Sequence, residues 1–275
     1  MKKLLSIALA IALFAMLACA AETLRYGKGD EALAGGFEGA LEAEDRISAY
    51  NAMLDEGGAC LITQQELIEN LQGYSLGDVR TDIQPVAFLA QGDLYIVCGA
   101  ETAAEANLTD LTSLKQYLEE NEYGLQLMRS FKATNADYAS MILMEELYFD
   151  SDIFVDEEDQ YASINDGLYV LVVDTSKAME LEGEGCVVLG ALTEERTKEY
   201  PDLPCAAECG IPVVRGTYYA IVVPTGADAS AFEGASLAEE ALSAANLRAP
   251  DEGISIADDI EAMVYYMTAE GLFFY

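Results

Sequence analysis

The chain has 275 residues, of which 52% are hydrophobic, so it can form a sizeable core and is not an unfolded polar chain. It carries 49 acidic and 14 basic residues, for a formal net charge of −35, and it has no histidine. A chain this acidic repels nucleic acid and anionic membrane surfaces. Without histidine there is no Ser–His or Cys–His nucleophile pair, and no acid pair stands out among 49 carboxylates, so an enzyme is not expected.

The first 20 residues have the pattern of an export signal. Two lysines precede an apolar run, Leu4–Leu17, that is too short to span a bilayer comfortably. Two processing routes fit. Met16-Leu17-Ala18-Cys19 is an imperfect lipobox, which would leave a lipid-anchored Cys19 on the outer face of the cytoplasmic membrane. Cleavage before Ala21 would instead release a periplasmic protein.

Export changes the charge and limits the chemistry of any ligand. Removing residues 1–18 takes away two lysines and no acid, so the net charge goes from −35 to −37. A small anion bound by this chain therefore needs a local positive site, because the field of the whole protein opposes it.

The cysteines indicate buried thiols and no metal site. Cys60, Cys98 and Cys186 lie in apolar runs, where a free buried thiol is expected. Cys205 and Cys209 are four residues apart and share one face of a short expected helix. A zinc site would need two further soft ligands, and the chain has no histidine to supply them, so we expect no metal and no cofactor.

Residues 21–40 are small, polar and rich in glycine, and we expect a loose lead-in there. Helices are then expected over 41–54, 64–71, 109–121, 135–147, 156–164, 176–181, 229–245 and 256–269. Strands are expected over 59–63, 83–89, 94–98, 124–128, 153–155, 168–173, 186–192 and 213–223. This alternation of apolar strands and helices predicts parallel sheets covered on both faces.

The order of the elements predicts a two-lobed protein. Leu94–Cys98 leads into the alternating middle section and Tyr218–Val223 leads out of it, as expected for an inserted lobe joined by a double hinge. We therefore expect lobe 1 over 21–99 and 217–275, and lobe 2 over 100–216. A ligand would lie between the lobes, where helix N-termini can point backbone N–H groups at an anion.

The segment Glu194–Asp228 has a pattern of charged loop, proline-bounded turn and strand, at Arg196, Pro201-Asp202-Leu203-Pro204, Glu208, Gly210, Gly216, Pro224 and Gly226. In this pattern, residues 80–230 resemble the solute-binding proteins of tripartite tricarboxylate transporters. Asp82–Ala90, Leu108–Leu118, Ser163–Val170 and Gly183–Arg196 resemble further family segments in the same order. The resemblance implies a type II periplasmic-binding-protein-like α/β fold and capture of a small di- or tricarboxylate for membrane transporter subunits.

The family's carboxylate loop corresponds to Arg129–Tyr138 in this sequence. The resemblance and the physical pattern together select Arg129, Ser130, Lys132, Thr134 and Asn135 as ligand-binding residues. A strand that ends before a helix N-terminus, with hydroxyl and amide side chains and two cations, suits an anion. The competing interpretation is ordinary helix capping by Thr134 or Asn135 beside two surface cations. Arg215 and Lys177 are weaker candidates that fit solvated charges.

The sequence departs from the family in two places. Arg129, Lys132 and Thr134 stand where the family loop has glycines, so the backbone has less freedom to approach a ligand. The family's first strand, glycine loop and helix have no clear counterpart in 21–40, which predicts a shortened first lobe or a changed pocket. An acidic surface lipoprotein on the same scaffold, binding a protein partner and no solute, is therefore the alternative function.

Overall fold

The computed structural model describes residues 23–64, 66, 83–129, 134–154 and 157–251. Within these residues the chain forms two compact units. One comprises the residues up to Gln91 together with those from Tyr218 onward, and the other comprises Gly92–Thr217. The expected export signal, the lipidation site and the helix over 256–269 lie outside the described residues.

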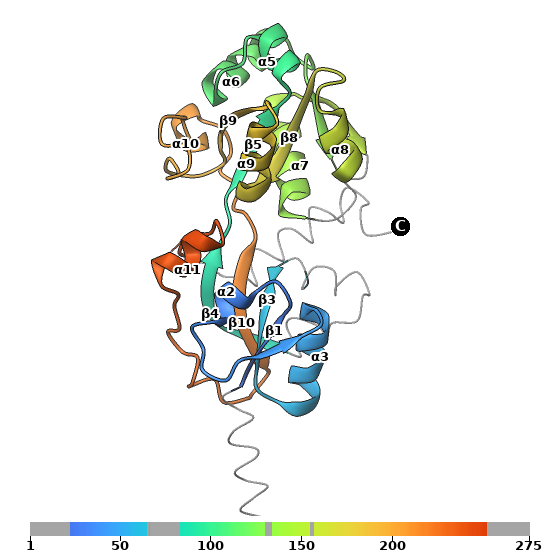
Figure 1. Cartoon of the computed structure of the whole chain (residues 1–275). Coiled ribbons are helices and arrows are strands. Elements are labelled where there is room, and N and C mark those ends of the chain that lie inside the picture. Colours follow the sequence, from blue (N-terminus) through green and yellow to red (C-terminus); the bar gives the residue numbers. More distant parts are fainter. Residues whose placement is uncertain (1–22, 65, 67–82, 130–133, 155–156, 252–275) are drawn as a thin grey trace, which may run out of the picture. The chain divides into compact units, whose positions relative to one another are not determined.

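The first unit is a five-stranded sheet in the order β2-β1-β3-β10-β4. Its strands are β1 (Leu24–Gly27), β2 (Leu41–Ala43), β3 (Ala59–Thr63), β4 (Ile83–Gln91) and β10 (Tyr218–Pro224). Its helices are α2 (Glu31–Ala34), α3 (Arg46–Glu56) and α11 (Glu239–Ala244). Helix α3 contacts β1, β2 and β3 and buries Ala49, Tyr50 and Met53 (Figure 1).

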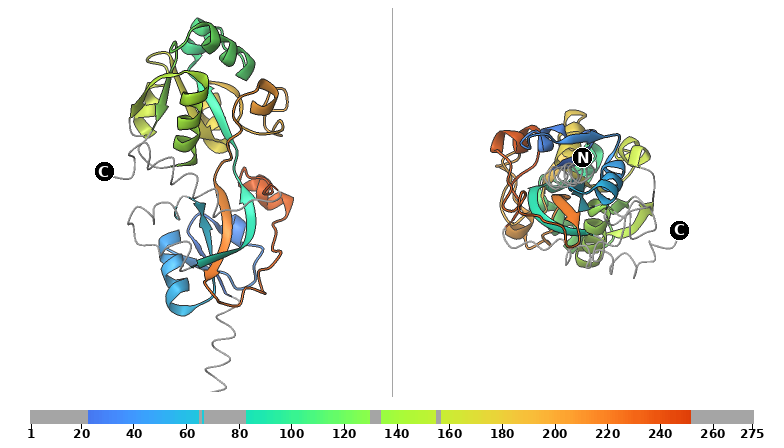
Figure 2. Two further views of the ribbon diagram at one scale, coloured as in Figure 1. Left: turned by 180° about the vertical axis from the view of Figure 1, so that it is seen from behind. Right: turned by 90° about the horizontal axis from the view of Figure 1, so that it is seen from below.

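The second unit has a sheet in the order β7-β6-β8-β5-β9. Its strands are β5 (Leu94–Cys98), β6 (Gln126–Arg129), β7 (Asp150–Phe154), β8 (Tyr169–Asp174) and β9 (Val187–Ala191). Its helices are α5 (Ala100–Ala106), α6 (Leu111–Glu120), α7 (Asn135–Leu147), α8 (Glu157–Ser163), α9 (Thr175–Gly183) and α10 (Ala206–Cys209). Helix α7 contacts β6 and β8, and the reverse view shows it against the sheet (Figure 2).

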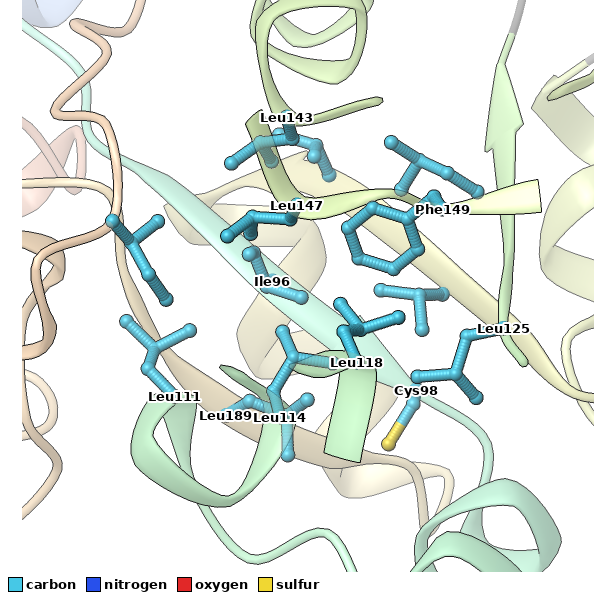
Figure 3. Close-up of a cluster of buried hydrophobic side chains, with 14 of the residues drawn as sticks. Ile96, Cys98, Leu111, Leu114, Leu118, Leu125, Leu143, Leu147, Phe149 and Leu189 are labelled. Carbon is cyan, nitrogen blue, oxygen red and sulfur yellow. The ribbon is translucent and has the colours of Figure 1, made fainter. Parts of the chain in front are cut away.

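The sheet of the second unit is buried on both faces, as the apolar strands predicted. Alternate residues of β5 point to opposite sides. Leu94, Ile96 and Cys98 join one cluster with α5, α6 and α7 (Figure 3). Tyr95 and Val97 join a second cluster, which includes Ala178 and Leu181 of α9.

Both sheets are mixed, so the expectation of parallel sheets was wrong in one strand of each. Strand β10 runs antiparallel to β3 and β4, and β5 runs antiparallel to β8 and β9, whereas β1 pairs in parallel with β2 and β3. Both strands begin just after a boundary between the units, β5 two residues after Gly92 and β10 directly after Thr217.

The chain passes between the two units twice, at Gln91/Gly92 and at Thr217/Tyr218, and these two crossing segments pair with each other. Tyr218 is opposite Gln91 in the register of β10 and β4, and the Gly92 N–H donates to the Thr217 carbonyl oxygen at 2.9 Å. Because β5 pairs with β8 and β9, it belongs to the second unit, so the first boundary falls at Gln91/Gly92. Sequence analysis placed that boundary after residue 99, because a run of apolar residues does not specify its sheet.

Other differences from the predicted elements are local. Leu41–Ala43 is strand β2, and the helix expected from Leu41 begins at Arg46, where the Asp45 side chain accepts the Ser48 N–H. Helix α5 was not predicted, because its alanine-rich sequence has no strong apolar period. The long helix expected over 229–245 is reduced to α11.

All five cysteines in the described residues are free. Cys60, Cys98 and Cys186 are buried, which confirms the expectation of buried free thiols. Burial raises the pKa of the Cys98 thiol to about 12, and it also raises the pKa of Cys60 and Cys186. These three thiols are therefore protonated at neutral pH and weakly nucleophilic.

Gly190 in β9 should be required for packing of the second unit. Its φ is +147°, and an added Cβ would lie 2.4 Å from the Pro204 carbonyl oxygen and 2.8 Å from Leu111 Cγ. We predict that Gly190→Ala lowers the free energy of unfolding by about 2–4 kcal/mol, from overpacking and backbone strain. Urea unfolding followed by circular dichroism measures this loss.

Gly183→Ala is the matched control. Gly183 ends helix α9, and an added Cβ there meets no atom within 4 Å. It should leave stability unchanged or raise it slightly, because alanine reduces the conformational entropy of the unfolded chain. Equal unfolding curves for the two variants would contradict the packing assigned to Gly190.

Candidate functional site

The segment that sequence analysis selected lies where β6 ends and α7 begins. Arg129 is the last residue of β6, and α7 starts at Asn135. Ser130 and Lys132 lie outside the described residues. The described geometry therefore concerns Arg129, Thr134 and Asn135.

Thr134 caps the helix, as the competing interpretation predicted. Its hydroxyl oxygen accepts the Asp137 N–H at 3.1 Å, and its backbone is extended. Asp137 is buried in the first turn of α7, where a carboxylate interacts favourably with the helix dipole. Thr134 thus fixes the start of the helix.

Asn135 connects the start of α7 to the segment before β10. The Asn135 side-chain amide donates to the Gly216 carbonyl oxygen at 3.1 Å and to the Arg215 carbonyl oxygen at 3.4 Å. Gly216 itself lies close to the other crossing, since an added Cβ would be 2.5 Å from the Gly92 carbonyl oxygen. Asn135 therefore places the α7 N-terminus beside the two crossings.

The competing interpretation also made Arg129 a surface cation, and this was wrong. Arg129 is 4% exposed, so it is not a surface cation, and among the described residues it is the only lysine or arginine that is buried. A buried guanidinium is expensive unless negative groups or hydrogen-bond acceptors surround it. Arg129 thus places a positive charge at the end of the strand that precedes α7.

The two weaker candidates have other surroundings. Lys177 Nζ is 2.7 Å from the Glu180 carboxylate and 4.3 Å from the centre of the Tyr161 ring. Arg215 has an exposed side chain, and its carbonyl oxygen accepts from Asn135.

The family-like segment from Glu194 onward is held by Arg196. Its Nε donates to both Glu208 carboxylate oxygens, at 2.9 and 3.1 Å, and its Nη1 reaches the Pro201 and Asp202 carbonyl oxygens. Glu208 also accepts the Cys205 N–H at 3.0 Å. The hydrogen bond from Arg196 is the largest cause that lowers the pKa of Glu208. This motif therefore closes a loop of the second unit.

The first unit contains the N-terminal element that sequence analysis expected to be missing. β1 is followed by a turn in which the Asp30 N–H donates to the Gly27 carbonyl oxygen at 3.1 Å, and then by α2. Gly29 has φ +104°, a conformation that glycine adopts without strain. The expectation of a loose lead-in over 21–40 was wrong, because four residues suffice for the strand when β2 and β3 flank it. The alternatives of a shortened first lobe or a changed pocket stay predictions.

Sequence reasoning also missed an ion-pair network at the ends of β1 and β3. Arg46 donates to both carboxylate oxygens of Asp30, at 2.5 and 2.6 Å, and to Glu66 at 2.8 Å. The Arg46 guanidinium also lies 5.5 Å from the centre of the Tyr219 ring. Burial lowers the pKa of Arg46, but the hydrogen bonds and charges of Asp30 and Glu66 outweigh it, and the net shift is upward. The glycine-rich turn before Asp30 was the available signal.

The described residues contain no group of three histidine, cysteine or acidic side chains that could hold a metal ion. In the same part of the chain, no helix combines the length and apolar character needed to cross a membrane.

No family model matches the sequence, and no curated protein matches it. Solved structures do match. A TctC solute binding protein from Polaromonas, solved with no ligand, has a TM-score of 0.64 at 13% identity, over 91% of this chain and 96% of that one. MatC from Rhodopseudomonas palustris, solved with malate, has a TM-score of 0.57 at 14% identity, and the match covers 91% of this chain and 98% of MatC. A second R. palustris protein, solved with adipate, has a TM-score of 0.56 at 13% identity, and the match covers 91% of this chain and 95% of that protein.

This chain has the fold of a solute-binding protein. The expected two-lobed, periplasmic-binding-protein-like α/β fold is thereby confirmed. The structural neighbours include proteins of the TctC and Bug types, in line with the sequence resemblance to tripartite tricarboxylate transporter binding proteins. Both are binding proteins.

The Asp30–Arg46 pair should stabilise the first unit. Asp30 is 3% exposed and its side chain does not cap α2, so its main described role is to bind Arg46. We predict that Asp30→Asn lowers the free energy of unfolding by about 1–3 kcal/mol, the usual loss for a hydrogen bond to a charged group. Urea unfolding of the purified protein measures it.

Glu56→Gln is the control, because it removes the same charge from an ion pair with Arg25 in which the Glu56 side chain is 66% exposed. A solvent-exposed carboxylate contributes little, so the unfolding midpoint should stay near that of the parent protein. A loss as large as that of Asp30→Asn would show that net charge, and not the buried pair, sets the stability.

Proposed function

We propose that this protein is an extracytoplasmic solute-binding protein that captures a small di- or tricarboxylate for a tripartite tricarboxylate-type transporter. The solved structures of similar fold support it, since two of them were determined with malate and adipate. Within this chain, the observation that carries the proposal is the buried Arg129 at the end of β6, just ahead of the α7 N-terminus.

The physical argument is electrostatic. A helix N-terminus favours an anion, and α7 has 13 residues, enough for a full dipole. Arg129 ends the strand that precedes this helix, and an arginine guanidinium can bind a carboxylate through two parallel hydrogen bonds. Asp137 offsets part of this positive charge, so the ligand site is less basic than Arg129 alone implies.

The proposed ligand-binding residues divide into two groups. Arg129, with Ser130 and Lys132 from the loop outside the described residues, would contact the carboxylate. Thr134 and Asn135 would position the helix, because their described hydrogen bonds go to Asp137 N–H and to the carbonyl oxygens of Arg215 and Gly216.

The proposed location and partners follow from the same function. The protein would be exported and would deliver its ligand to membrane transporter subunits. Periplasmic proteins among the structural neighbours support export. A lipid anchor at Cys19 stays a prediction.

The alternative function, a scaffold that binds a protein partner and no solute, has one observation in its favour. The resemblance predicts that the glycine loop after the first strand holds the other side of a carboxylate. Here that loop ends in the buried Asp30, which forms an ion pair with Arg46. Arg46 also binds a second carboxylate, that of Glu66. Such a cluster offers an incoming anion little positive potential.

Carboxylates should stabilise the mature protein if it binds them. Ligand at 100 times its Kd adds about 2.7 kcal/mol. For a chain of this length, that corresponds to a rise in Tm of about 5–10 °C. Thermal unfolding with a panel of di- and tricarboxylates measures the shift, with monocarboxylates as controls. If no acid in the panel shifts the Tm of well-folded protein, the transport function is wrong and the alternative stands.

Removing the loop cation and hydroxyl should weaken that shift. We predict that Lys132→Ala and Ser130→Ala each reduce the rise in Tm at a fixed carboxylate concentration, because each removes a donor to the anion. Lys198→Ala is the control, since it removes one positive charge from an exposed residue of the same unit. Equal shifts in Tm in all three variants would show that the carboxylate does not bind at this loop.

A further inference from the structure

Tyr123 and Tyr148 form an exposed aromatic pair on the second unit. Their side chains are 57% and 52% exposed, and the ring centroids lie 6.5 Å apart at an interplanar angle of 78°. The Tyr123 N–H donates to the Tyr148 carbonyl oxygen at 2.9 Å. Two large rings in contact with each other thus face solvent, tied together by a backbone hydrogen bond.

The backbone beneath this tyrosine pair is firmly anchored. Tyr148 stands between the buried Leu147 and Phe149, and Tyr123 stands two residues before the buried Leu125. Leu125, Leu147 and Phe149 meet Leu118 of α6 in one cluster (Figure 3). A partner that bound the tyrosine pair would therefore have little backbone to order.

Local stability does not account for tyrosine at either position. Both residues have left-handed backbone conformations, with φ of 62° and 56°. The other two described non-glycine residues with positive φ are Asn107 and Asn246. Asparagine adopts this conformation more readily than an aromatic residue does. The exposed rings gain no core packing in return.

The surroundings of the tyrosine pair are negative. Helix α6 ends at Glu120 and α7 ends at Leu147, and neither has a basic residue in its last turn. The exposed acids near these ends are Glu119, Glu120, Glu122, Glu145 and Glu146. Lys115 is the nearest preceding cation in sequence, and its Nζ donates to the Cys209 and Gly210 carbonyl oxygens. Two helix C-terminal dipoles add to the negative potential.

We propose that the Tyr123–Tyr148 pair is a docking surface for a basic, arginine-bearing segment of a protein partner. A guanidinium stacks on tyrosine faces and is drawn to the surrounding carboxylates, so both features select the same chemistry. Nucleic acid and anionic membrane are excluded by charge. The proposal does not rest on solute binding, because it uses none of the residues between Arg129 and Asn135.

The test uses the mature full-length protein and a fluorescein-labelled tetra-arginine peptide amide, titrated at low ionic strength. The variants are Tyr123→Asn, Tyr148→Asn and the double variant, which keep the net charge and suit the left-handed backbone. Met179→Asn is the matched control, because Met179 is an exposed large apolar residue of the same unit. The Tm of the tyrosine variants should equal or exceed that of the parent.

We expect the double variant to raise the Kd for tetra-arginine by about fivefold or more, from the loss of two cation–π contacts. Met179→Asn should leave the Kd unchanged, and tetra-lysine should bind the parent protein less tightly than tetra-arginine. An unchanged Kd in the double variant would overturn the proposal. The proposal would also be overturned if light scattering showed a dimer for the parent protein and a monomer for the double variant. The tyrosine pair would then bind a second copy of this chain.

Carboxylate-induced shifts in Tm are measured on the same variants. The double variant should show the same carboxylate-induced shift in Tm as the parent protein. Loss of the shift in the double variant would show that the two sites are not independent. A parent protein that shows no carboxylate shift but binds tetra-arginine through the tyrosine pair would refute only the transport function.

Discussion

The pairing of the two crossing segments is the constraint on which the rest of the structure depends. Gly92 and Gly216 bring the two backbones so close that a Cβ on Gly216 would meet the Gly92 carbonyl oxygen. This contact continues the register of β4 and β10 on one side and positions β5 on the other. Asn135 binds the same segment, so the start of α7 is fixed by it as well. Within the second unit, this segment thus fixes the helix end that the proposed ligand site uses.

Charge is the second constraint. In a chain with 14 basic and 49 acidic residues, the described cations mostly join parts of the chain together. Arg46 joins α3 to the turn after β1, Arg196 closes a loop, and Lys115 binds carbonyl oxygens at the end of α10. Arg129 differs in burial, because it is the one lysine or arginine of the described residues that is buried, at the end of β6. An anion site in so acidic a chain requires a local positive charge of this kind.

The sequence motif that most resembles the binding-protein family has a structural role in this chain. Arg196 and Glu208 hold the loop around Pro201, and Gly216 permits the close crossing. These residues therefore stabilise the local structure of the second unit. They say little about the ligand, since ligand contacts depend on loops whose residues differ.

Apart from α5, the sequence by itself determined the element order in the second unit, because apolar periodicity and helix caps are local signals. It also determined the burial of that sheet on both faces and the two-lobed plan. Helix α7 was predicted over its full length, with Thr134 as one of two candidate caps. Only the tertiary structure decided which sheet β5 joins, that β1 is a strand, and that Arg46 pairs with Asp30 across 16 residues. It also decided that Arg129 is buried and that Asn135 binds backbone oxygens 80 and 81 residues away. Each of these depends on contacts between residues distant in sequence, which no local pattern records.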